Sequence, residues 1–167
     1  MPEQIRWIEG PWPGKLAISS RPRGGDWLAD EIRLWRSAGV NTVLSLLTSE
    51  EEDSLELQEE GKTVGAQGMT FLSFPIRDRQ VPDSETELAA VLEKLRRDLS
   101  AGHNVLVHCR QGIGRTGLVA ACLLAPHGGG VKKVLEKLSL LRGVPVPETP
   151  EQQQWIEHYA ETLAHTK

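Results

Sequence analysis

The segment from His108 to Gly117, with the sequence HCRQGIGRTG, constrains this chain more than any other. It lies between two apolar runs, Val105 to Val107 and Leu118 to Leu124, so we expect it to join a buried strand to a helix. Its three glycines allow backbone conformations that a β-carbon forbids, so the segment can curl into a tight loop. In such a loop several backbone N–H groups converge beside a helix N-terminus, where they bind an anion.

Cys109 and Arg115, separated by five residues, suit this loop to phosphate chemistry. Convergent amides, a helix N-terminus and nearby arginines favour the thiolate of a cysteine, which is its nucleophilic form. Arg115 can bind two phosphate oxygens, and Thr116 can donate its hydroxyl to the Cys109 sulfur. We expect His108 to position Cys109 by hydrogen bonds rather than to act as a base. The loop N–H groups complete the expected phosphate site, at Arg110, Gln111, Gly112, Ile113, Gly114 and Arg115.

Three other interpretations fit the loop less well. A Walker loop requires Gly-Lys-Ser/Thr and has no cysteine at this place. A sulfur-transferase loop of the rhodanese type has four residues between cysteine and arginine, whereas this loop has five. The simplest alternative is a glycine-rich turn around a buried, inert cysteine. Cysteine, arginine, threonine and two glycines at fixed offsets coincide by chance at about one position in a million, which disfavours that alternative.

The loop resembles the Cys-x5-Arg-Ser/Thr signature of the protein tyrosine and dual-specificity phosphatases. The wider chain is similar to the small dual-specificity enzymes, above all those of the kinase-associated type. This resemblance implies a phosphotyrosine-phosphatase-like fold and a phosphocysteine intermediate. It implies no cofactor and no metal, because the loop amides and the arginine stabilise the charge. The matching segments are Pro13 to Leu16, Phe74 to Asp78, Leu118 to Leu124, Leu141 to Gly143, and Thr149 with Gln152.

The segment from Phe74 to Asp83 holds the candidate general acid. Cleavage of a phosphoester requires a proton for the departing oxygen, and a loop that leaves the end of a neighbouring strand can supply it. Taken alone, Asp78 would be interpreted as a turn or cap residue. The resemblance implies that Asp78 is the general acid. Asp83 is the alternative, although with Ser84 it also fits the start of the next helix.

Two further side chains allow more than one role. Gln152 can form a capping box with Thr149, and the resemblance implies that a glutamine of this segment places the hydrolytic water. Gln153 is an alternative for that second role. Cys122 lies in an apolar helical stretch, so we expect it in the core, and a resolving-thiol role toward Cys109 is the alternative.

Alternating strand and helix patterns predict one α/β domain over residues 1–167, with a mainly parallel central sheet flanked by helices. The expected strands cover residues 5–8, 15–18, 41–47, 69–74 and 104–108. The expected helices cover residues 27–38, 50–60, 85–101, 116–125, 131–142 and 150–164. Residues 61–68 are expected to form a loose connection.

Capping signals mark several helix starts. Asp26 is the expected cap of the first helix, and Ser49 with Glu52 forms an expected capping box before the second. Another capping box is expected from Ser84 with Glu87. The acidic run from Glu50 to Asp53 is expected to be a solvated helix start, and a metal site there is disfavoured because its ligands would be consecutive.

Composition and charge limit the expected partners. The net charge of −4 gives no general attraction to nucleic acid or to a membrane surface. Two cysteines suit a reducing compartment, and neither a signal peptide nor a membrane-spanning run is apparent. We therefore expect a soluble, cytoplasmic monomer. The positive field that a phosphate needs is local, and five arginines could supply it: Arg77, Arg79, Arg110, Arg115 and Arg142.

These features together predict a cysteine-dependent phosphatase that acts on phosphorylated proteins. The short chain lacks the extra elements of large tyrosine-specific enzymes, which favours a shallow cleft for phosphotyrosine and also for phosphoserine or phosphothreonine. A phosphoinositide phosphatase is the first alternative, disfavoured because Gln111 and Ile113 occupy positions where lipid-directed relatives carry basic residues. A non-catalytic phosphate-binding module is the second, disfavoured because nucleophile, arginine and candidate acid occur together.

Overall fold

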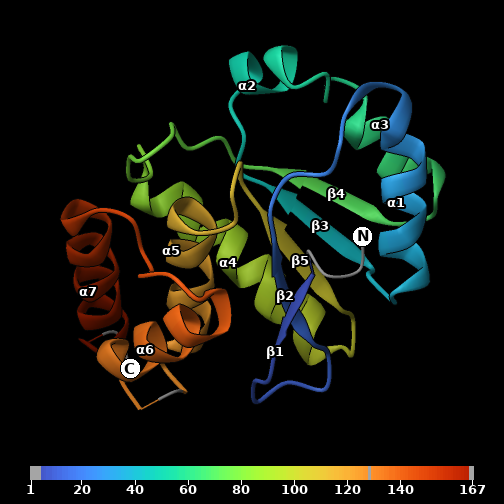
Figure 1. Cartoon of the computed structure of the whole chain (residues 1–167). Helices are drawn as coiled ribbons and strands as arrows, with labels where there is room; N and C mark the ends of the chain where they lie inside the picture. Colours follow the sequence, from blue (N-terminus) through green and yellow to red (C-terminus); the bar gives the residue numbers. More distant parts are fainter. Residues whose placement is uncertain (1–4, 128, 166–167) are drawn as a thin grey trace.

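The computed structural model describes residues 5–127 and 129–165, in which five strands form one sheet of order β1-β2-β5-β3-β4 (Figure 1). β2, β5, β3 and β4 run parallel, and β1 pairs antiparallel with β2 at one edge. This confirms the predicted α/β fold with a mainly parallel sheet. The strands are β1 Arg6–Ile8, β2 Leu16–Ser19, β3 Thr42–Ser45, β4 Thr70–Ser73 and β5 Val105–His108.

Helices cover both faces of this sheet (Figure 1). α1 and α3 pack on one face, α4 and α5 pack on the other, and α6 and α7 pack against α5. No helix in residues 5–127 and 129–165 combines the length and the apolar character needed to cross a bilayer. The helices are α1 Leu28–Ser37, α2 Ser49–Ser54, α3 Glu60–Ala66, α4 Glu85–Ser100, α5 Gly114–Leu124, α6 Val131–Arg142 and α7 Pro150–His165.

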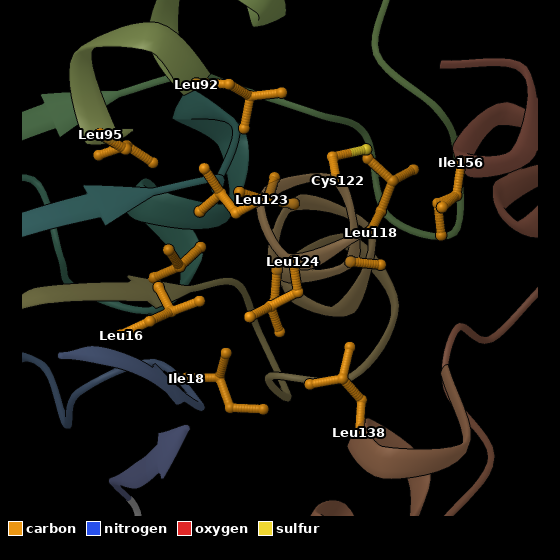
Figure 2. Close-up of a cluster of buried hydrophobic side chains, with 14 of the residues drawn as sticks. Leu16, Ile18, Leu92, Leu95, Leu118, Cys122, Leu123, Leu124, Leu138 and Ile156 are labelled. Atoms are coloured by element: carbon orange, nitrogen blue, oxygen red, sulfur yellow. The ribbon is translucent and has the colours of Figure 1, made fainter. Parts of the chain in front are cut away.

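Alternation along β5 divides its side chains between two cores. Val105 and Val107 belong to the larger core beneath α4 and α5, and Leu106 belongs to the smaller core beneath α1 and α3. Figure 2 shows part of the larger core around α5. Every residue of α5 is buried. Because both faces of the sheet are covered, every residue of its central strands β2, β5 and β3 is buried. The same alternation sends the His108 side chain toward Trp35 of α1, whereas Cys109 returns to the larger core.

Several local predictions of secondary structure are wrong. Residues 61–68 are not a loose connection, because α3 occupies most of them; two glycines hide this short helix from a sequence pattern. The predicted helix over 50–60 ends as α2 at Ser54. The capping box before α2 forms between Thr48 and Glu51 rather than one residue later. Asp26 does not cap α1, because it lies inside a 3-10 turn that precedes the helix.

The other helix starts follow the sequence more closely. The Ser84 hydroxyl accepts from the N–H of Glu87, and α6 covers the predicted residues 131–142. The ends of the predicted domain, residues 1–4 and 166–167, lie outside the described residues.

Candidate active site

The loop from Cys109 to Ile113 joins β5 to α5 at the edge of the sheet where the parallel strands end. Gly112 has a φ of +74°, and a β-carbon on it would lie 2.5 Å from the carbonyl oxygen of Ser19, so only glycine fits there. The N–H of Gly112 donates to Cys109 Sγ over 3.3 Å. No side chain caps α5, so the N–H groups of its first turn are available to an anion.

Three carbonyl groups of the loop are contacted by groups that do not belong to it. In a planar trans peptide the N–H points opposite to the preceding C=O. The N–H groups of the three following residues therefore point away from these partners, and one of them, the N–H of Gly112, contacts the sulfur. The three carbonyl contacts are Cys109 with His108 Nδ1 (3.3 Å), Arg110 with the N–H of Arg21 (3.2 Å) and Gln111 with Arg142 Nη2 (2.9 Å).

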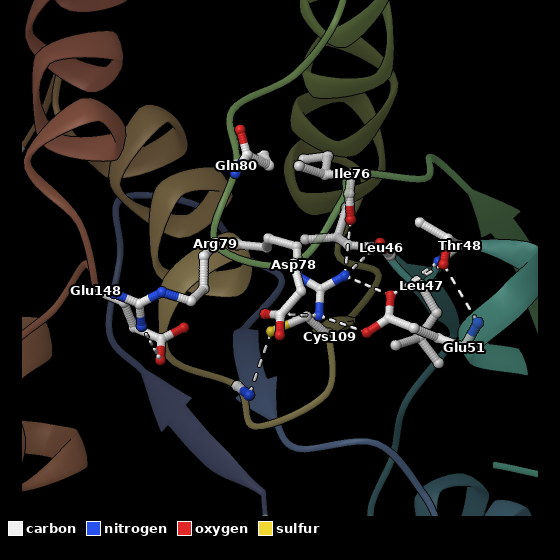
Figure 3. Close-up of polar contacts among 12 residues, drawn as sticks. Leu46, Leu47, Thr48, Glu51, Ile76, Asp78, Arg79, Gln80, Cys109 and Glu148 are labelled. Carbon is white, nitrogen blue, oxygen red and sulfur yellow. Dashed lines mark hydrogen bonds and ion pairs between the residues drawn. The ribbon is translucent and has the colours of Figure 1, made fainter. Parts of the chain in front are cut away.

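Arg115 lies almost completely buried beside the loop. Its two terminal nitrogens form a bidentate ion pair with Glu51, at 2.7 and 2.9 Å, and Nη1 also donates to the carbonyl of Ile76 at 2.7 Å (Figure 3). Burial disfavours the charged form, yet the hydrogen bond to Glu51 and the charges of Cys109, Glu51 and Asp78 raise the pKa of Arg115. The guanidinium is therefore a permanent cation, held at one place within the field of the sulfur.

Glu51 is a site residue that the sequence interpretation left in solvent. Its side chain is only 12% exposed, because the carboxylate accepts from Arg115 and from the N–H of Thr48 (Figure 3). Burial opposes ionisation, but the hydrogen bonds from Arg115 and Thr48 lower the pKa of Glu51. The expectation of a solvated acidic run is thus wrong at Glu51. The capping pattern could indicate its local bond to Thr48, whereas no local pattern indicates a partner 64 residues away.

Asp78 lies on the connection between β4 and α4 (Figure 3). Its Oδ1 is 3.4 Å from Arg115 Nη2, and 55% of its side chain is exposed. Asp83 instead pairs with Arg77 at 3.4 Å and is 82% exposed. Of the two candidate acids, the structure therefore brings Asp78 to the arginine and leaves Asp83 in solvent.

The segment that carries Asp78 is fastened on its far side as well. Arg79 pairs with Glu148, at 3.7 Å, on the segment before α7 (Figure 3). The carbonyl of the next residue, Gln80, accepts from Gln152 Nε2 at 3.1 Å. Together with the bond from Arg115 to the Ile76 carbonyl, these contacts hold both sides of Asp78 while its carboxylate stays accessible.

Gln152 is fully buried, and its side-chain amide is engaged at both atoms. Oε1 accepts from the N–H groups of Glu148 (3.1 Å) and Thr149 (3.2 Å), and the Thr149 hydroxyl accepts from the Gln152 N–H, so the predicted capping box is formed. A β-carbon on Gly114 would lie 3.1 Å from Gln152 Oε1, so the Gln152 side chain lies against the start of α5. Gln153 is exposed and lines a groove of about 910 Å³ along α6 and α7, none of whose lining residues belongs to the loop.

The structure agrees with the predicted place of Cys122 but not with the predicted hydrogen bond of Thr116. The hydrogen bond predicted from Thr116 to the Cys109 sulfur does not form among the residues that the structure describes. Within residues 5–127 and 129–165 the Thr116 hydroxyl is buried without a hydrogen-bond partner, and the sulfur accepts from the Gly112 N–H instead. Cys122 is a free thiol in the larger core, as predicted, and its burial strongly raises the pKa of the thiol (Figure 2).

His108 lies behind the loop, fully buried. Its Nδ1 contacts the backbone carbonyl of Cys109, so the structure brings the two together as predicted. Its Nε2 lies 2.5 Å from Oε2 of Glu60, which the sequence interpretation did not single out. Nothing in the local sequence around Glu60 indicates this partner, 48 residues away.

Comparison with known proteins identifies the family. A family model described as "Swiss Army Knife protein, DSP-PTPase phosphatase domain" matches residues 2–160. A protein of Invertebrate iridescent virus 6, named as a tyrosine phosphatase, is 28% identical over 117 residues, which are 68% of this chain and 42% of the viral protein. Cyclin-dependent kinase inhibitor 3 of Sus scrofa is 28% identical over 131 residues, which are 77% of this chain and 61% of that protein. The chain therefore spans less than two thirds of the length of these curated relatives.

A crystal structure of kinase-associated phosphatase, with its catalytic-site cysteine substituted by serine, matches with a TM-score of 0.87 at 22% identity. The match covers 96% of this chain and 95% of the other, and it shows that the two share a fold. The family model, which matches residues 2–160, shows family membership, which a shared fold alone does not. As the resemblance implied, this chain belongs to the DSP-PTPase family, the dual-specificity and tyrosine phosphatase domains.

Proposed function

We propose that this chain is a cysteine-dependent phosphatase that hydrolyses phosphotyrosine, and also phosphoserine and phosphothreonine, in proteins through a phosphocysteine intermediate. One observation carries the proposal: the Cys109 sulfur accepts from the N–H of Gly112 in the loop, and the buried cation of Arg115 is fixed within the field of that sulfur. Family membership and the names of the relatives support the same class of reaction.

The donors left free on Arg115 support a phosphate site. A guanidinium has five N–H donors. Glu51 and the Ile76 carbonyl take three of them, and a fourth is directed at Asp78. The Nε–H and the donor that faces Asp78 can bind two phosphate oxygens when Asp78 turns toward the leaving group. The N–H groups from Arg110 to Arg115 bind the remaining charge.

The proposed reaction has two steps. In the first, the Cys109 thiolate forms an S–P bond while the P–O bond breaks, and the protonated carboxyl of Asp78 gives its proton to the departing oxygen. In the second, water attacks phosphorus, the Asp78 carboxylate takes its proton, and the S–P bond breaks to restore the thiolate. The unpartnered Thr116 hydroxyl is the proposed donor to the departing sulfur, and Gln152 is proposed to align the water.

Hydrolysis of para-nitrophenyl phosphate tests the reaction class. The protein should turn this substrate over, and Cys109→Ser should abolish turnover while it still binds inorganic phosphate. Turnover by Cys109→Ser would contradict the proposed nucleophile, and phosphate binding without any turnover would instead indicate a binding module. A panel of phosphotyrosyl, phosphothreonyl and phosphoinositide substrates then tests the substrate class, since a preference for the lipid would contradict a protein substrate.

The finer expectations about partners and location stay predictions. A phosphorylated protein as substrate agrees with the names of the relatives. The prediction of a cytoplasmic monomer without nucleic-acid or membrane partners is based on the net charge of −4 and on two cysteines that are free thiols. Sedimentation at several protein concentrations tests the monomer.

A further inference from the structure

A buried acidic residue, Glu60, lies behind the active loop and takes no part in the reaction proposed above. It is the first residue of α3 and has no exposed surface. Its Oε2 is 2.5 Å from His108 Nε2, and within the described ranges its Oε1 is buried without a hydrogen-bond partner. Burying a carboxyl group is costly unless it is paired. The stability of this arrangement therefore depends on the contact with His108.

The two contacts of His108 determine which ring nitrogen carries a proton. Nδ1 faces the carbonyl oxygen of Cys109, which can only accept, so a hydrogen bond there requires a protonated Nδ1. Nε2 faces a carboxyl group, which can satisfy it in two ways. The carboxylate of Glu60 can accept from Nε2–H, or its carboxylic acid can donate to a bare Nε2. In both cases one proton lies between Glu60 and Nε2, and Nδ1–H stays directed at Cys109.

The direction of the Cys109 carbonyl sets the direction of the next amide. Because the peptide is planar and trans, the Arg110 N–H points away from the side on which His108 holds that carbonyl. If Nδ1 lost its proton, a nitrogen lone pair would face a carbonyl oxygen at 3.3 Å, and the repulsion would turn the peptide. The first amide of the phosphate cradle would turn with it.

We propose that Glu60 is a positioning residue of this active site. By fixing the protonated state of His108 Nδ1, it holds the Cys109 carbonyl outside the loop and directs the Arg110 N–H toward the phosphate. The catalytic consequence rests on the proposed phosphatase function, whereas the proton arrangement does not.

Two substitutions of Glu60 separate the role in proton placement from mere filling of space. Glu60→Leu keeps a side chain of similar size but cannot form a hydrogen bond with Nε2. Glu60→Gln can donate its amide N–H to Nε2, which preserves the protonated Nδ1. Glu59→Leu is the matched control, since the neighbouring Glu59 is exposed. Circular dichroism during thermal unfolding establishes which variants are folded.

Long-range proton–nitrogen NMR of the histidine rings reads the proton arrangement directly, and the His108 signals are those lost in His108→Asn. We expect a protonated Nδ1 in the unsubstituted protein and in Glu60→Gln, and a deprotonated or mixed Nδ1 in Glu60→Leu. A bare Nδ1 in the unsubstituted protein would overturn the proposal even if Glu60→Leu fails to fold. So would a protonated Nδ1 that persists in folded Glu60→Leu.

Kinetics with para-nitrophenyl phosphate tests the consequence for catalysis. Displacing a positioned group by about 1 Å can lower the rate by up to about 10²-fold. Glu60→Leu should therefore lower kcat/KM by about 10- to 100-fold. Glu60→Gln should restore it to within about threefold on the same argument, and Glu59→Leu should leave it unchanged. Equal losses in Glu60→Leu and Glu60→Gln would overturn the positioning role. Absence of turnover in the unsubstituted protein would instead contradict the phosphatase function and leave the NMR result valid.

Discussion

Replacing Glu51 by glutamine should disable the active-site arginine without touching the loop. Arg115 is buried and binds Glu51 through two charge-assisted hydrogen bonds of 2.7 and 2.9 Å. Glutamine keeps one acceptor and presents an NH₂ group to the other guanidinium nitrogen. One bond to a charged group is then lost, which costs about 1.5–3 kcal/mol of stability. The Ile76 carbonyl still binds Nη1, so we expect about 2 kcal/mol, below the 3–5 kcal/mol that a fully orphaned buried ion costs.

The loss of transition-state stabilisation in Glu51→Gln should exceed its loss of unfolding free energy. A displacement of about 1 Å at a positioned group costs about 10²-fold in rate, so Glu51→Gln should lower kcat/KM for para-nitrophenyl phosphate by about that factor. This corresponds to about 2.7 kcal/mol of transition-state stabilisation. Glu50→Gln is the matched control, because it removes the same charge from an exposed neighbour on α2.

Urea unfolding at several pH values tests the same contact by its pH dependence. The pKa of Glu51 is lowered from its usual 4.5, because hydrogen bonds from Arg115 and Thr48 outweigh the effect of burial. An acid whose pKa is lower in the folded than in the unfolded protein stabilises the folded state at pH values above its unfolded pKa. This contribution is lost as the pH falls through the folded-state pKa. The difference in unfolding free energy between the unsubstituted protein and Glu51→Gln should therefore shrink below pH 4.5. Unchanged kcat/KM in Glu51→Gln, or a pH-independent difference, would refute this account of Arg115.

Two further substitutions and one chemical modification test other parts of the structure. Asp78→Asn should lower kcat by about 10²- to 10⁴-fold for a substrate with a poor leaving group, and an equal loss in Asp83→Asn would contradict the assignment of the acid. Gly112→Ala forces a β-carbon to 2.5 Å from a backbone oxygen, so phosphate affinity measured by calorimetry should fall at least tenfold, or about 1.4 kcal/mol. Both cysteines are buried, but burial strongly raises the pKa of the Cys122 thiol, so Cys122 should resist iodoacetamide in the folded protein while Cys109 reacts; mass spectrometry that finds Cys122 modified first would contradict the assignment.

The sequence predicts the frame of this fold well because its signals are local. Continuous apolar runs indicate the buried strands, and capping residues indicate the starts of α4 and α7. Where two local signals compete, the pattern cannot choose between them. Thr48 with Glu51 and Ser49 with Glu52 have the same spacing, and only tertiary structure selects the first pair. α3 escapes prediction because Gly61 and Gly65 lower its intrinsic helix propensity.

The candidate site divides in the same way between local and distant information. Cys109 and Arg115 are recognisable because their spacing within one loop is the signal. Glu51 and Glu60 are not, because their partners lie 64 and 48 residues away in the chain. In the sequence each stands beside other acids, and nothing there marks its distant partner. Only the tertiary fold, which brings α2 to Arg115 and α3 to His108, makes them partners of the site.

Trapping the phosphoenzyme tests the central claim most directly. The protein is mixed with para-nitrophenyl phosphate, quenched in acid within one turnover, digested and analysed by mass spectrometry. We predict one added phosphoryl group on the peptide that contains Cys109, at the cysteine, and its absence in Cys109→Ser. Sustained turnover with no phosphoryl group on Cys109, or with the group on another residue, would contradict the account.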